Sequence, residues 1–183
     1  YNRANYFSWG PHQRLSAPSK TSQMVGSDEQ IDLTQMEEKD WPIEALTQGV
    51  WTIFPHISIA SFYGGGGRGA MISQLFPGTT VGESFTTQFY VMEKEPESDE
   101  VRQGAHDQFA FLETVVADED YTTGKRQHEA LQSGMLDKVW FGRNEGGGQA
   151  FHQWVDRLIK AGDDDLPGIF TAERENETLE AAE

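Results

Sequence analysis

Three adjacent carboxylates, Asp118, Glu119 and Asp120, form the most chemically suggestive group in this 183-residue sequence. The spacing of apolar residues predicts that they open a helix that continues to Leu131, with Asp118 as its N-cap. Carboxylate oxygens can bind a metal ion, but acids in a first helical turn also interact favourably with the helix dipole. Composition and spacing alone favour the second explanation.

The histidines do not form a recognisable metal-binding pattern. A metal site needs two or three imidazoles that converge, often from closely spaced positions on one helix. Taken singly, each histidine is typical of a surface or packed residue. His56 stands out because it lies among small residues on a strand predicted to be strongly apolar. The five histidines are His12, His56, His106, His128 and His152.

Glycines and catalytic motifs give little further direction. The pattern Gly64-x-Gly66-x-x-Gly69 formally matches a dinucleotide fingerprint. That fingerprint requires a following helix, whereas a strand is predicted to follow here, so nucleotide binding is disfavoured. The sequence contains no Gly-x-Ser-x-Gly elbow and no evident Ser/His/Asp set.

Composition excludes several classes of function. The net charge is −16, from 14 basic and 30 acidic residues, so binding to nucleic acid or to an anionic membrane surface is disfavoured. Cysteine is absent, which excludes disulfides, thiolate metal sites and cysteine nucleophiles. No apolar run reaches the roughly 18 residues of a membrane span. We expect a cytoplasmic protein.

The order of the predicted elements indicates an α+β fold. Residues 1–48 show no lasting periodicity and are predicted to be irregular, with a short helix near 43–46. Residues 50–63, 70–76 and 81–92 alternate as an antiparallel meander, with glycine and proline turns between them. Helical spacing follows over 98–116, from Asp118 onward and over 148–161, with a short strand at 139–141. The helices are expected to pack on one face of a curved sheet.

Several segments resemble the catalytic domain of Rieske non-haem iron oxygenase α subunits, in matching order and spacing over most of residues 1–161. Glu119-Asp120, with Leu131 eleven positions after Asp120, resembles the family's ligand-bearing helix, although His128 stands where the family often has Gln. The other segments that carry the resemblance are Gly10-Pro11-His12-x-Arg14, Gly49-Val50-Trp51-Thr52-Ile53-Phe54-Pro55-His56, Leu75-Phe76-Pro77-Gly78 and Phe151-His152-Gln153-Trp154.

The resemblance implies a START-like helix-grip fold, in which a curved antiparallel sheet packs on a long C-terminal helix around an apolar cavity. It implies that Asp120 is the carboxylate ligand of a mononuclear Fe(II), which two histidines complete. It also implies that Phe54, His56 and Ser58 line the substrate cavity. On this basis residues 1–170 form a partial catalytic domain, and residues 171–183 form an acidic tail that is expected to fray.

The resemblance further implies partners and a reaction. The complete protein would hydroxylate or oxidatively demethylate an aromatic or other small organic substrate with O₂. Electrons would come from a ferredoxin or reductase through a Rieske [2Fe–2S] cluster, usually of a neighbouring subunit in a homotrimer. Neither nucleic acid nor a membrane is expected as a partner.

Two departures from the family pattern leave alternatives open. Without cysteine this chain cannot hold the cluster, and the family's paired iron histidines would precede the segment that resembles residues 1–14. The chain by itself is therefore expected to be inactive. One alternative is a metal-free START-like module that binds an apolar small molecule in the same cavity. Another is a structural or interaction domain in which the acids form a solvated face.

Overall fold

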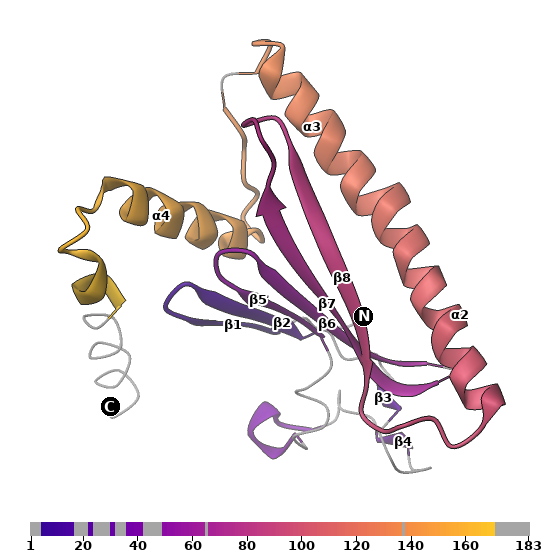
Figure 1. The fold of residues 1–183 in the computed structure, drawn as a ribbon. Helices are drawn as coiled ribbons and strands as arrows, with labels where there is room; N and C mark the ends of the chain where they lie inside the picture. The colour runs from indigo at the N-terminus through magenta and orange to yellow at the C-terminus, as the bar shows by residue number, and fades with distance from the viewer. Residues whose placement is uncertain are drawn as a thin grey trace.

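A computed structural model describes residues 5–16, 22–23, 30–31, 36–41, 49–64, 66–136 and 138–170. Its main feature is a six-stranded antiparallel sheet with helices after it, which confirms the α+β class (Figure 1). The strand order is β1 (Asn5–Trp9), β2 (His12–Ser16), β5 (Gly49–Ile53), β6 (Ile57–Gly64), β7 (Gly67–Pro77) and β8 (Ser84–Met92). A short pair, β3 (Ser22–Gln23) with β4 (Gln30–Ile31), and the 3₁₀ turn η2 (Glu38–Asp40) lie apart from it.

The meander predicted from the sequence is confirmed, with two corrections to its length. The region predicted as irregular contains the β1–β2 hairpin, which pairs through β2 with β5. The stretch 50–63 is two strands, because the chain turns at residues 54–56 around a cis Phe54–Pro55 bond. The helix predicted near 43–46 and the frayed tail at 171–183 lie outside the described residues.

Glycine shapes the tight turn between β6 and β7. Gly64 pairs with Gly67, and Gly67 has φ +99°, a backbone conformation that side chains rarely tolerate. A Cβ atom on Gly66 would lie 2.7 Å from atoms of Ala105 on the next helix. The loop is therefore glycine-rich because a helix backbone packs directly against it.

One unbroken helix follows the sheet, in place of the two that the sequence predicts. It consists of α2 (Asp99–Val115), the π-helical segment η3 (Val116–Tyr121) and α3 (Thr122–Gln132), with helical backbone at each junction. Ser98 is its N-cap, and the Ser98 hydroxyl accepts a hydrogen bond of 3.2 Å from the Val101 amide. Asp118 is therefore not an N-cap, and the prediction that a helix begins there is wrong.

The last helix, α4 (Gly146–Lys160), is amphipathic, as its sequence predicts. Trp154 is buried, at 5% exposure, whereas Ile159 is 76% exposed. Residues 139–141 are not a strand. Within the described residues, no helix is long and apolar enough to cross a membrane.

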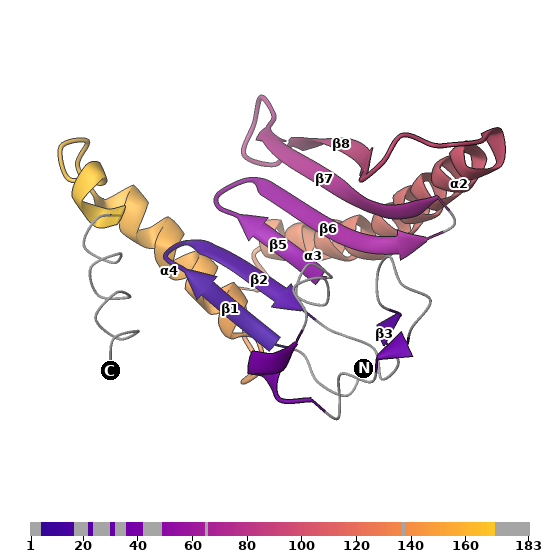
Figure 2. The same ribbon diagram turned by 90° about the horizontal axis from the view of Figure 1, so that it is seen from below.

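The two faces of the sheet have different surroundings. One face, here called the helix face, contacts α2 through Tyr90, whose ring lies 5.6 Å from that of Phe109. It contacts α4 through Gln13, whose side-chain amide donates to the Gly147 carbonyl at 2.9 Å. Figure 2 shows both helices behind the sheet, on the same side of it. The opposite, outer face carries Trp51 and Ile59, which pair with each other as the alternation predicts.

Candidate functional site

The three carboxylates singled out in the sequence all lie in the π-helical segment between α2 and α3. Asp118, Glu119 and Asp120 are exposed, and the Thr122 hydroxyl donates 3.0 Å to the Ala117 carbonyl five residues back. A π-helical turn is a rare interruption that weakens the regular hydrogen-bond ladder and is frequently found at functional sites. It changes the rotational register of the side chains that follow it.

The position of these acids removes the structural explanation that the sequence suggested. Carboxylates are stabilised by the helix dipole only within the first turn of a helix. Here that turn contains Asp99 and Glu100, whereas the three acids lie beyond residue 115, in the interior of the continuous helix. Adjacent like charges in a helix interior gain nothing from the dipole, and these three are exposed to solvent.

The predicted substrate-binding residues lie around the β5–β6 turn, but they do not all face the same way. The Phe54 ring lies 5.1 Å from the ring of Phe151 on α4. Ser58 is on the helix face, in register with Thr52. His56 is exposed, and its ring lies 5.8 Å from that of Phe76, a residue of the outer face. The structure thus places Phe54 and Ser58 on the side of the helices and directs His56 toward the outer face.

No described group of three or more His, Asp and Glu side chains is arranged to hold a metal ion. His106 is on α2, His128 on α3 and His152 on α4, where its ring packs 5.3 Å from that of Phe141. Among the described side chains, Asp120 therefore stands without the two histidines that a three-ligand iron site would need.

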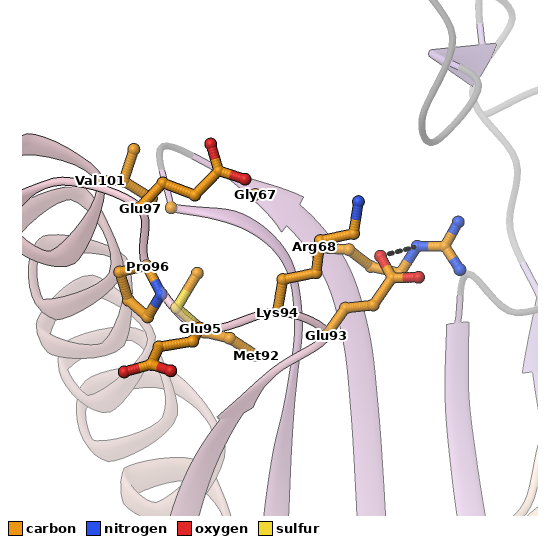
Figure 3. Close-up of a pocket in the computed structure, with 10 residues that line it drawn as sticks. Gly67, Arg68, Met92, Glu93, Lys94, Glu95, Pro96, Glu97 and Val101 are labelled. Carbon is orange, nitrogen blue, oxygen red and sulfur yellow. Dashed lines mark ion pairs between the residues drawn. The ribbon is translucent and has the colours of Figure 1, made fainter.

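Two cavities lie away from these residues. One, of about 210 Å³, lies beside the β6–β7 turn and the start of α2, where Arg68 forms a 3.4 Å ion pair with Glu93 (Figure 3). It is at the opposite end of β6 from the Phe54–His56 turn, about 25 Å away along the strand. Its lining, with glutamates on both sides of Pro96, is charged and open.

The second cavity, of about 590 Å³, separates the β7–β8 turn from α3. His128, Lys125 and Glu129 line it from the helix, and Glu83 lines it from the turn. The His128 Nε2 atom is buried and has no hydrogen-bond partner in the part of the chain described here. Neither cavity includes Asp120, Phe54, His56 or Ser58.

A buried cation on the outer face was not anticipated from the sequence. Arg14 on β2 is only 8% exposed, and its guanidinium lies 4.1 Å from the ring centre of Phe7, 5.2 Å from that of Trp51 and 5.6 Å from that of Trp9. Its Nε atom has no hydrogen-bond partner among the described residues. The signal was available only once β1, β2 and β5 were known to be neighbours.

Comparison with known protein families identifies the family of this chain. Residues 1–161 of the 183 match the family described as ring hydroxylating alpha subunit (catalytic domain). The chain belongs to this family. No match was found among curated proteins or among solved structures.

Membership in the ring-hydroxylating family confirms the resemblance drawn from the sequence and supports an oxygenase of this general kind. The matched region contains all the strands of the main sheet, the π-helical acids and the whole of α4. The family does not by itself assign a ligand or a substrate to individual residues here.

Proposed function

We propose that this chain forms the part of a mononuclear iron oxygenase catalytic domain that provides the single carboxylate ligand, Asp120, and lines the substrate cavity. The observation that supports Asp120 most directly is its position in a π-helical turn in the interior of a long helix. Neither the helix dipole nor capping explains three acids there. Metal ligation does explain a locally altered register that presents one acid to a partner.

The described residues fit only part of the group that the family implies. A 2-His-1-carboxylate site needs two imidazoles besides Asp120, and no such set of three is found among the described residues. The [2Fe–2S] cluster does not fit at all, because the sequence has no cysteine. We place the histidines and the cluster on polypeptide outside this sequence. When bound, the iron would activate O₂ for insertion into the substrate.

The contribution of this chain is then binding and positioning. Residues 1–170 act as one catalytic unit, in which the helix face of the sheet holds the organic substrate. Phe54 packs on α4 and closes one end of that face, while Ser58 offers a hydroxyl group near its centre. The expected partners are O₂, a ferredoxin or reductase, and two further copies of the complete α subunit.

The test is to compare Asp120→Ala with Asp118→Ala in the complete, cluster-containing protein. We expect Asp120→Ala to lose most of its bound mononuclear iron and at least about 100-fold in substrate-dependent O₂ uptake, because a ligand is removed. Asp118→Ala removes a neighbouring acid of the same π turn and should retain both properties. Iron is measured by elemental analysis, with the cluster quantified separately by its absorbance.

If Asp120→Ala retains iron and turnover, the ligand assignment is wrong. The metal-free module is the competing proposal, and it requires the complete protein to bind an apolar ligand with no iron requirement. This competing proposal would be supported if the protein still bound the apolar ligand after chelation of its iron, and if both variants bound that ligand as tightly as the wild type does.

A further inference from the structure

A continuous row of neutral polar side chains crosses the helix face of the sheet. Each strand of the six-stranded sheet contributes one member, and each member is the direct register partner of the next. Such partners lie about 5 Å apart, so the row extends across the full width of the sheet. Its members are Ser8, Gln13, Thr52, Ser58, Ser73 and Gln88.

Polar side chains under helices are costly unless they form hydrogen bonds, and the outer parts of this row do form them. Gln13 donates to the Gly147 carbonyl of α4 at 2.9 Å, and Gln88 donates to the Ser73 hydroxyl at 3.2 Å. At the centre, the Thr52 and Ser58 hydroxyls have no such side-chain partner among the described residues and are only partly buried. The centre of the row is therefore the part that remains available to a ligand.

The next row on the same face, two residues further along each strand, is apolar at its centre. Val50 and Ala60 are register partners there, and Val50 is 43% exposed. Two residues of a strand span about 7 Å, close to the length of a benzene ring with one substituent. The centre of the helix face thus places two hydroxyls beside an apolar surface of ring size.

The charge of this surface restricts the ligand further. The lysine and arginine residues of the described strands are Arg14 and Arg68, and the register places both on the outer face. The strands themselves therefore offer an anionic group no cation on the helix face, in a chain whose net charge is −16. A carboxylate-bearing substrate is therefore disfavoured relative to a neutral one.

We infer that the helix face selects a substrate in which a neutral hydrogen-bonding group, such as an amide or hydroxyl, is attached to an apolar ring. The polar group lies over Thr52 and Ser58, and the ring lies over Val50 and Ala60. This inference rests on the proposed function and narrows its substrate class.

The test measures binding of three probes of similar size, benzamide, toluene and benzoate, to the complete iron-containing protein. Benzamide should bind more tightly than toluene or benzoate. The double variant Thr52→Val/Ser58→Ala should raise the dissociation constant of benzamide about tenfold, because two hydrogen bonds are lost. It should change the dissociation constant of toluene less than twofold. Thr87→Val, the same chemical change on the outer face, is the matched control and should change neither affinity.

Dissociation constants are measured by isothermal titration calorimetry, and O₂ uptake is recorded on the same samples. If the double variant unfolds, the single variant Ser58→Ala tests the same contact, and its affinity for benzamide should fall about threefold. Benzoate as the tightest ligand, or benzamide affinity unchanged in both variants, would overturn the inference. If the wild type then still has normal iron content and probe-dependent O₂ uptake, only the inference about the substrate class is wrong, and the proposed function stands.

Discussion

At the level of single residues, Arg14 poses the clearest energetic question in the molecule. A buried cation loses its hydration, and attraction to aromatic faces restores only part of the lost free energy. Phe7, Trp9 and Trp51 surround the guanidinium, yet no described carboxylate pairs with it. We therefore expect Arg14 to stabilise the fold mainly by filling space between three rings, with a smaller contribution from its charge.

This view predicts different effects for two substitutions at position 14. Arg14→Met keeps most of the volume and removes the buried charge, so the free energy of unfolding should change by no more than about 1 kcal/mol. Arg14→Ala leaves a cavity among the rings and should lower the free energy of unfolding by about 2–4 kcal/mol. Urea denaturation of both variants provides the measurement. A loss above about 3 kcal/mol for Arg14→Met would show that the charge itself is essential.

At the level of elements, the turn between β7 and β8 shows how local hydrogen bonds tune a carboxylate. The Thr79 hydroxyl donates to the Glu83 carboxylate at 2.7 Å, and this bond, with further ones from Thr80 and the backbone, holds the pKa of Glu83 below its usual value. Since the folded pKa is depressed, the resulting stabilisation is present above the ordinary glutamate pKa. It is lost as the pH falls through the folded value.

Thr79→Val should therefore raise the pKa of Glu83 toward that of a free glutamate. As the solution is acidified, the stabilisation from this carboxylate should then be lost at a higher pH than in the wild type. Carboxyl-carbon NMR titration measures the pKa directly in the folded protein. Thr87→Val on the neighbouring strand serves as a control and should leave it unchanged. A Glu83 titration identical in Thr79→Val and the wild type would contradict the role given to this hydroxyl.

The elements also show what the sequence could and could not predict. The alternation around Trp51, Ile59 and Phe89 predicts the central strands, because successive side chains of a strand point to opposite faces of the sheet. The β1–β2 hairpin was missed although Gly10-Pro11, the turn that joins its two strands, is a local turn signal. The π turn was missed because Asp118 has the chemistry of a cap, and only tertiary context decides whether the helix actually starts there.

The candidate site follows the same division. Asp120 could be singled out because its neighbours in sequence resemble a known ligand-bearing helix. The polar row containing Ser58 and Ser73 could not, because its members are scattered along the chain and come together only through the strand register. Sequence patterns thus point to sites on one helix far better than to sites spread across a sheet.

At the level of the whole molecule, the net charge of −16 opposes compaction. The repulsion is long-ranged at low ionic strength and is screened within about 10 Å at 0.1 M salt. The thermal unfolding midpoint should therefore rise between about 10 mM and about 150 mM NaCl. Circular dichroism at constant pH measures it, and a nonionic osmolyte of equal osmolality is the control. A midpoint that falls with salt would mean that favourable ion pairs outweigh the repulsion.

The hydrogen bond between Gln13 and Gly147 joins residues that are 134 positions apart. Helix α4 begins with Gly146, Gly147 and Gly148, which are poor at nucleating a helix before the sheet is there to receive it. During synthesis the first hairpin therefore leaves the ribosome long before the helix that packs on it has been made. We therefore expect the docking of α4 to be a late step of folding, and until then the Tyr6 ring lacks its neighbour Gly147.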